Sequence, residues 1–304
     1  MHREHCGIME EAMMESASEQ TAPTVSVLIP VYNTQAEWLR ETIDSVLNQD
    51  LPDFELLLAD DCSTQPEVRE VLESYHDPRI RVIYNERNMG CAATTNKLFD
   101  MARGRYWMRL DADDTIPPSR LRKQVEHFET HPDIGVCACW FDHMATGEVF
   151  RIPEDDMAIR QILCISCIIP NSAAMYRASV MREHHIRFDM EFPMSDDWAL
   201  LRRLLRVTKF GAVQEVLFHY RTSPHSFSRR SKVGMRRDTY ILQQRIRREN
   251  PEAWNEIRDK IVTTRRYRLF GLIPLLTITK SGNETTCKLF SCITLYTSRD
   301  KFKF

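Results

Sequence analysis

The strongest indication of the fold is the stretch that begins Val25-Ser-Val-Leu-Ile-Pro30 and continues to Leu110. The first six residues form an apolar run of the length of a buried strand. The segment from Ala36 to Gln49 then repeats its apolar residues at helical spacing. The same alternation predicts strands over 25–30, 54–59, 80–84 and 106–110, and helices over 36–49, 66–75 and 91–102. Apolar strands that alternate with helices predict an α/β fold with a mainly parallel, Rossmann-like sheet covered by helices on both faces.

Charge divides the chain into two parts. The 304 residues include 41 basic and 43 acidic side chains, a net charge of −2, and 43% of all residues are hydrophobic. Residues 229–304 carry 18 basic and 7 acidic side chains, a net charge of +11, so residues 1–228 carry a net charge of −13. An acidic body with a basic C-terminal part argues against a protein that coats nucleic acid. We therefore expect no nucleic-acid partner.

The composition shifts along the chain predict three segments. Residues 1–22 are expected to be a disordered N-terminal segment, and 23–230 an α/β catalytic domain. Residues 231–304 are expected to be a basic extension that begins with two helices, the second after Pro251. This extension contains a short tandem repeat, Tyr267–Leu276 and Cys287–Tyr296, whose copies lie twenty residues apart. Two copies are too few for a solenoid.

Targeting signals and cysteine usage favour the cytoplasm. No apolar stretch follows the N-terminus, and the longest apolar runs are about half of the roughly 20 residues that a membrane-spanning helix needs. The nine cysteines are an odd number, and most lie in apolar, strand-like sequence. This pattern is typical of reduced, buried thiols rather than a disulfide scaffold.

Polar and acidic residues follow three of the four predicted strands. These are Pro30-Val-Tyr-Asn33, Asp60-Asp61-Cys-Ser63 and Asp111-Ala-Asp-Asp114. The carboxyl ends of parallel strands meet at one edge of a sheet, where ligands bind. Carboxylates gathered there repel one another unless a cation lies among them, and a hard divalent ion with oxygen ligands is the natural candidate. A simpler interpretation, in which Asp61 and Asp114 only cap the following helices, stays open at this point.

Several well-known site motifs are absent. The chain has only nine glycines, with no G-x-G-x-x-G and no G-x-x-x-x-G-K, and it has no H-E-x-x-H. These absences argue against a Rossmann dehydrogenase, a P-loop ATPase and the simplest zinc hydrolase.

Taken in order, the strand-end motifs and Ser195-Asp-Asp-Trp198 resemble those of the family 2 glycosyltransferases, whose catalytic domain has the GT-A fold. The resemblance extends over residues 24–230. This sequence departs from the usual pattern at three positions. Cys62 stands where Gly is usual, Gln65 where Asp is frequent, and Asp196 where Glu commonly precedes the catalytic base.

The resemblance implies roles for individual residues. The residues that the resemblance assigns to nucleotide-sugar binding are Pro30, Tyr32, Asn33 and Asp61. Asp111 would lie at the ribose or diphosphate, and His225 would lie in a loop that closes over the diphosphate. Asp113 would hold Mn²⁺ or Mg²⁺, Asp197 would be the general base, and residues 171–177 would lie beside the acceptor pocket. Alternatives remain for two residues, because Asp197 could cap its helix and His225 could be an ordinary surface histidine.

The expected activity is transfer of one sugar from a nucleotide-sugar, such as a UDP-sugar, to a hydroxyl of a glycan or lipid-linked acceptor. One base without a nucleophilic carboxylate implies inversion at the anomeric carbon, by analogy with inverting hydrolases. The repeat resembles the C-terminal tails of some glycosyltransferases of bacterial surface polysaccharide synthesis. Lipopolysaccharide synthesis is one example of such synthesis. Alternatives are a processive polysaccharide synthase and a catalytically silent nucleotide-sugar-binding protein.

The basic, apolar C-terminal tail is expected to attach the protein to an anionic membrane surface, on the inner face of the cell membrane. The alternative is that its apolar runs are ordinary strands or helices of the fold.

Overall fold

The structure is a computed structural model that describes residues 22–222, 232–258, 262–269, 273–281, 284–289 and 293–299. The expected disordered segment, apart from Ala22, and the predicted site residue His225 lie outside these ranges. Contacts divide the chain into two compact units. The first comprises Met1–Asp156 and Ile168–Asp238, and the second comprises Met157–Cys167 and Thr239–Phe304.

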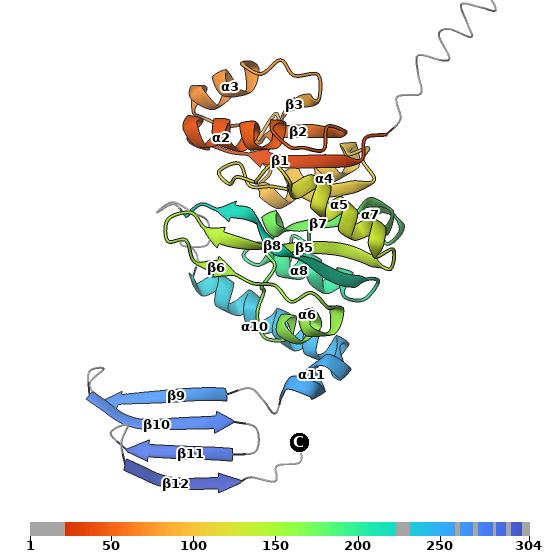
Figure 1. Cartoon of the computed structure of the whole chain (residues 1–304). Coiled ribbons are helices and arrows are strands. Elements are labelled where there is room, and N and C mark those ends of the chain that lie inside the picture. Colours follow the sequence, from red (N-terminus) through yellow and green to blue (C-terminus); the bar gives the residue numbers. More distant parts are fainter. Residues whose placement is uncertain are drawn as a thin grey trace, which may run out of the picture. The chain divides into compact units, whose positions relative to one another are not determined.

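The first unit is built on one mixed sheet (Figure 1). Its strands are β1 (Val25–Val31), β2 (Phe54–Asp60), β3 (Ile80–Tyr84), β4 (Tyr106–Arg109), β5 (Ile134–His143), β6 (Val149–Phe150), β7 (Ala174–Arg177) and β8 (Lys209–Tyr220). They are ordered β3-β2-β1-β4-β7-β5-β6, with β8 paired to β5. The pairs β1–β2, β2–β3, β1–β4 and β5–β8 are parallel, whereas β7 is antiparallel to both β4 and β5.

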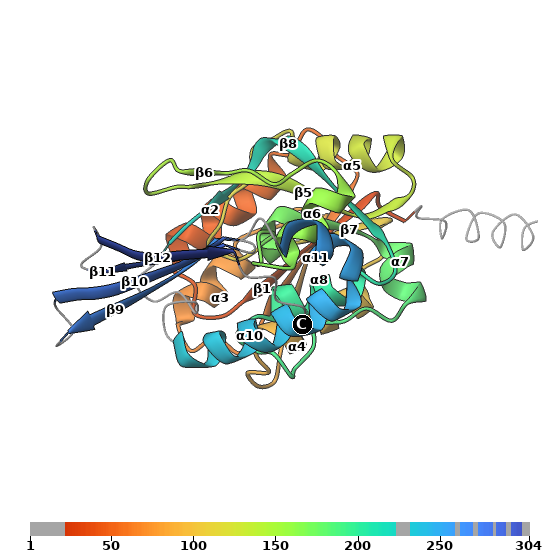
Figure 2. The ribbon, with the colours of Figure 1, turned by 90° about the horizontal axis from the view of Figure 1, so that it is seen from below.

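The helices of this unit are α2 (Ala36–Leu47), α3 (Pro66–Glu73), α4 (Cys91–Met101), α5 (Arg120–Thr130), α7 (Ala178–Glu183) and α8 (Asp196–Leu204), with a 3₁₀ turn η1 (Asn171–Ala173). The three helices predicted between the first strands are therefore present, and each ends within two residues of its predicted C-terminus. Strands β1 and β2 are buried along nearly their whole length, which explains their continuous apolar sequence. Figure 2 shows the hairpin of β5 and β6, which the sequence analysis did not predict.

A buried polar contact ties β1, β2 and the start of β4 together. The hydroxyl of Ser26 donates to Glu55 Oε1 (2.6 Å) and accepts from the Gly104 N–H (2.8 Å). Glu55 also accepts from the backbone N–H (2.7 Å) and Nε (3.0 Å) of Arg103. A Cβ at Gly104 would lie 2.5 Å from the Ser26 nitrogen, so only glycine allows this close approach.

The second unit combines helices with a separate sheet. Its helices are α6 (Asp156–Leu163), α10 (Lys232–Glu249, in this unit from Thr239) and α11 (Pro251–Ile257). Arg160 donates to Asn250 (3.1 Å), Gln161 donates to Glu256 (2.6 Å), and the Arg247 guanidinium lies over the Trp254 ring. The two helices expected at the start of the extension are thus present as α10 and α11.

The tandem repeat forms part of an antiparallel sheet of β9 (Val262–Leu269), β10 (Ile273–Ser281), β11 (Glu284–Leu289) and β12 (Ile293–Arg299), seen in Figure 1. Each copy of the repeat begins in one strand and ends in the next. The copies therefore correspond to the β9–β10 and β11–β12 hairpins. The described residues of the tail's apolar runs lie in strands.

Candidate active site

The turn after β4 places Asp111 in an ion pair with a buried arginine. Arg109 Nη1 and Nη2 contact the two carboxylate oxygens of Asp111 at 2.9 and 2.6 Å, and Nη2 also donates to the Cys91 sulfur at 3.0 Å. The Ser172 hydroxyl donates to Asp111 Oδ2 (2.9 Å) and accepts the Asp111 N–H (3.0 Å). Arg109 is only 5% exposed. Asp111 is therefore held in one orientation by β4 and by η1, with its charge balanced by the chain itself.

Asp113 differs from Asp111 because no cationic side chain of the described residues forms an ion pair with it. Burial and the negative charge of Asp111 raise the pKa of Asp113 to about 6. Asp114 is fully buried, and burial together with Asp111 and Asp113 raises the pKa of its carboxyl well above the usual range. Its Oδ1 accepts the Arg221 N–H (2.8 Å), whereas its buried Oδ2 has no hydrogen-bond partner among the described residues. Negative charge at this turn is only partly compensated.

A divalent cation would neutralise the carboxylate charge that remains at the turn after β4. Within the described ranges, no group of three or more His, Cys, Asp or Glu side chains could hold a metal ion by itself. An ion at Asp113 would therefore take most of its ligands from a bound diphosphate and from water, as Mg²⁺ commonly does.

Asp61 directly follows β2, and its carboxylate forms hydrogen bonds inside the protein. It is 2% exposed and accepts hydrogen bonds from Asn85 Nδ2 (2.8 Å) and from the backbone N–H groups of Met89 (2.9 Å) and Gly90 (2.8 Å). Burial acts to raise the pKa of Asp61, but these hydrogen bonds outweigh it and the pKa is lowered. Gly90 has φ +85°, which favours glycine and lets two successive N–H groups reach one carboxylate. Asp61 thus holds the loop before α4 in place.

The residues after β1 form the neighbouring part of the same edge. Pro30 is the penultimate residue of β1, and Tyr32 is 49% exposed, so its ring is accessible to a ligand. Asn33 N–H donates to Ser63 Oγ (3.0 Å), and its side-chain oxygen accepts the Thr64 N–H (2.8 Å). Asn33 therefore joins the loops after β1 and β2.

The start of α8 carries the adjacent acids Asp196 and Asp197. Asp196 Oδ1 accepts the Asp197 N–H (2.9 Å), and Asp197 Oδ1 accepts the Trp198 N–H (2.7 Å). Burial and the charge of Asp197 raise the pKa of Asp196 to about 6, with Arg109 acting to lower it and Asp111 to raise it. Asp196 is therefore close enough to interact electrostatically with the Arg109–Asp111 pair.

The structure thus brings Pro30, Tyr32, Asn33, Asp61, Asp111 and Asp113 to the carboxyl-terminal edge of the sheet, with the first turn of α8 electrostatically linked to Asp111. Their roles stay predictions. Sequence reasoning missed Arg109, although a signal was available. Arg109 is a charged residue near the end of an otherwise apolar predicted strand, where arginine is rarely buried without a partner, and it lies two residues before Asp111.

The family model described as glycosyl transferase family 2 matches residues 26–184, more than half of the chain. The chain belongs to glycosyl transferase family 2. This match confirms the family that the motifs of the strand ends resemble.

Similar proteins include glycosyltransferases and an uncharacterized protein. An uncharacterized glycosyltransferase of Methanocaldococcus jannaschii is 29% identical over 211 residues, 67% of this chain and 72% of that protein. The putative teichuronic acid biosynthesis glycosyltransferase TuaG of Bacillus subtilis is 42% identical over 106 residues, 34% of this chain and 41% of TuaG. An uncharacterized protein of Sinorhizobium fredii, y4gI, is 44% identical over 130 residues, 42% of this chain but only 14% of y4gI.

Two solved structures share the fold. Residues 1–349 of S. aureus TarS, in complex with UDP-GlcNAc, align with a TM-score of 0.63 at 20% identity, over 75% of this chain and 67% of that fragment. The mannosyltransferase PcManGT of Pyrobaculum calidifontis, in complex with GDP-Man and Mn²⁺, aligns with a TM-score of 0.55 at 17% identity, over 79% of this chain and 76% of that structure. The predicted GT-A fold is confirmed.

Proposed function

We propose that this chain is an inverting glycosyltransferase that moves one sugar from a nucleotide-sugar, such as a UDP-sugar, to a hydroxyl of a glycan or lipid-linked acceptor. The observation that carries this proposal is the ion pair of Asp111 with the buried Arg109 beside Asp113, with Asp196 of α8 interacting electrostatically with that pair. The donors bound by TarS and by PcManGT support a nucleotide-sugar as the donor class.

The two aspartates of the turn have different parts in this proposal. Asp111, fixed by Arg109 and Ser172, would orient the ribose or the diphosphate. Asp113 would hold Mn²⁺ or Mg²⁺. Such an ion, when bound, stabilises the negative charge that develops on the diphosphate as the sugar departs. The backbone of both aspartates belongs to the edge of the sheet rather than to a long loop.

The acceptor hydroxyl must lose its proton as it attacks the sugar, and we assign this proton to the carboxylate of Asp197. Asp197 Oδ1 accepts the Trp198 N–H, which fixes the carboxylate in the first turn of α8. Trp198, the next residue of α8, is buried, which anchors the start of the helix. A single base acting opposite the leaving diphosphate gives one displacement, with inversion of the anomeric carbon.

We propose that the enzyme acts in bacterial surface polysaccharide synthesis, of which lipopolysaccharide synthesis is one example. The named role of TuaG in teichuronic acid biosynthesis supports this setting. Within the described part of the chain, no helix is both long and apolar enough to cross a membrane. We propose a cytoplasmic enzyme held peripherally on the membrane through its basic tail.

The test is slow donor hydrolysis by the purified full chain with Mn²⁺ or Mg²⁺ and UDP-, GDP- or dTDP-sugars, since hydrolysis needs no acceptor. We expect metal-dependent release of the nucleotide from one donor class. Asp113→Ala should abolish this release while the thermal unfolding midpoint stays near that of the wild type, because a strand-end carboxylate contributes little to the core. Glu70→Ala, at an exposed position of α3, is the matched control and should keep full activity.

Three results would count against the proposal. Full activity in a chelator would remove the metal from the mechanism. Donor binding without turnover would favour a silent nucleotide-sugar-binding protein. Long polymeric products from one binding event would favour a processive synthase.

A further inference from the structure

The backbone of the Ala112–Asp114 turn is clamped by groups from two distant segments. Thr42 on α2 donates its hydroxyl to the Ala112 carbonyl (3.0 Å). Arg221, directly after β8, donates Nε to the Asp113 carbonyl (2.7 Å) and its backbone N–H to Asp114 Oδ1 (2.8 Å). Each of the three residues of the turn is therefore held, while no basic side chain in the described part of the chain forms an ion pair with the Asp113 carboxylate.

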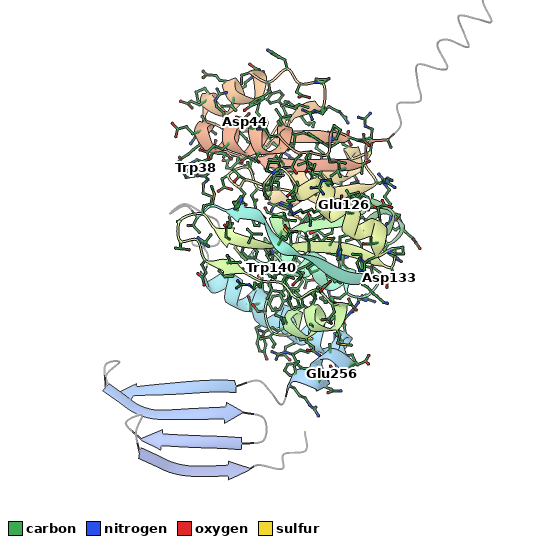
Figure 3. The ribbon with its side chains drawn as sticks, in the orientation of Figure 1. Trp38, Asp44, Glu126, Asp133, Trp140 and Glu256 are labelled. Atoms are coloured by element: carbon green, nitrogen blue, oxygen red, sulfur yellow. The ribbon has the colours of Figure 1, made fainter. Side chains whose placement is uncertain are left out.

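The Arg221 side chain is itself held by α2. Its Nη2 forms an ion pair with Glu41, and its guanidinium lies 5.2 Å from the ring centre of Trp38, which is labelled in Figure 3. The Arg221 side chain is 17% exposed, whereas that of Glu41 is 53% exposed. A guanidinium presents several donors in a fixed planar fork, so one arginine can bond inward through Nε and outward through Nη2. Arg221 thus connects the exposed carboxylate of Glu41 with the carbonyl of Asp113.

We infer that Glu41 is a positioning residue for the metal site, and that it acts through Arg221 on the turn that carries Asp113. This inference rests on the proposed function. Asp113 can meet an ion in a set geometry only while the backbone beneath it is fixed, and supporting contacts of this kind commonly decide metal affinity. Glu41 reaches the turn through Arg221, and its exposure means that the core does not depend on it.

Glu41→Gln in the full chain removes the charge of Glu41 but keeps its shape. Glu37→Gln is the matched control, because Glu37 is an exposed glutamate one turn earlier on α2. The measurement is Mn²⁺ affinity in the presence of UDP, GDP or dTDP, read from the electron paramagnetic resonance signal of free Mn²⁺. We expect Glu41→Gln to weaken Mn²⁺ binding about tenfold, the lower end of the loss that removal of a supporting partner causes. Its unfolding midpoint and the affinity of Glu37→Gln should match those of the wild type.

A double-mutant cycle tests the route of the effect. If Glu41 acts through Arg221, the double variant Glu41→Gln/Arg221→Gln should bind Mn²⁺ no more weakly than Arg221→Gln alone. Multiplicative losses in the double variant would overturn the inference, as would wild-type affinity in Glu41→Gln. If the wild-type chain itself binds no Mn²⁺ with any of the three nucleotides, the proposed metal-dependent function fails together with the inference. If the wild type binds Mn²⁺ and hydrolyses donor while Glu41→Gln is unchanged, only the inference fails.

Discussion

Cys62 occupies a backbone conformation that side chains seldom adopt. Its φ is +63°, in the left-handed region, directly after the buried Asp61. A residue with a Cβ loses roughly 1–2 kcal/mol in this conformation, which explains the usual glycine at this position of the family. Asn33, on the adjacent loop, has φ +50°, but asparagine tolerates this region better than most residues.

We expect Cys62→Gly to stabilise the protein by about 1 kcal/mol, because relief of the strain exceeds the extra entropy of glycine in the unfolded chain. Urea unfolding measures the change. Cys62→Ala is the control, since it removes the thiol and keeps the Cβ, and it should give no comparable gain. Equal stabilities of the two variants would show that φ at this position is not the cause.

At the scale of elements, Glu55 links β1 and β2 to Arg103, before the start of β4. Burial acts to raise the pKa of Glu55, but the hydrogen bonds from Ser26 and Arg103 outweigh it and hold the pKa below its ordinary value of 4.5. A carboxyl whose pKa is lower in the folded state stabilises the fold above the unfolded pKa, and this contribution is lost as the pH falls through the folded pKa.

Glu55→Gln should therefore lower the free energy of unfolding at pH 7 by about 2 kcal/mol, the range of a charge-assisted hydrogen bond. The difference between wild type and variant should shrink as the pH falls from 5 towards 3. Urea titrations at several pH values measure it, with Glu67→Gln on the exposed side of α3 as control. A difference that stays constant down to pH 3 would contradict the assignment.

The first turn of α8 carries two neighbouring acids, to which we assign different functions. Asp196 interacts electrostatically with Arg109 and Asp111, whereas the family resemblance implies that Asp197 is the base. We expect Asp197→Asn to lower sugar transfer on the order of 10²- to 10⁴-fold, the usual contribution of a general base, and still to bind UDP-sugar with Mn²⁺. Asp196→Asn should keep measurable transfer. Transfer assays and donor binding on both variants decide the assignment, and the reverse pattern would make Asp196 the base.

For the whole molecule, the distribution of charge predicts where the enzyme works. The tail carries Arg265, Arg266, Arg268, Lys280, Lys288, Arg299, Lys301 and Lys303 beside its short apolar runs. Basic residues near an anionic membrane contribute on the order of 1 kcal/mol each, and the attraction weakens as salt is added. A surface-bound enzyme would meet a lipid-linked acceptor in two dimensions.

We expect the full chain to float with anionic vesicles at low salt, and a chain ending at Lys260 to stay in the soluble fraction. Neutral vesicles and high salt are the controls, since both reduce the electrostatic attraction. Failure of the full chain to float, or equal flotation of the shortened chain, would show that the tail is not the membrane anchor.

The sequence alone determined the order of strands and helices in the first half of the chain and the acidic motifs at the strand ends. Both follow from local information. Periods of 2 and 3.6 residues identify the elements, and parallel connection brings the strand ends to one edge. The family could be predicted for the same reason, because its motifs are short and contiguous.

Only the tertiary structure decided which side chains support those motifs. Ser172 reaches Asp111 because β7 runs antiparallel between β4 and β5, and Arg221 reaches Asp114, 107 residues away, because β8 pairs with β5. Contacts at such separations depend on the register of strands inserted late in the chain, which no local pattern encodes. The same holds for the tail, where short apolar runs suit a strand or a helix equally well and pairing with neighbouring strands makes the choice.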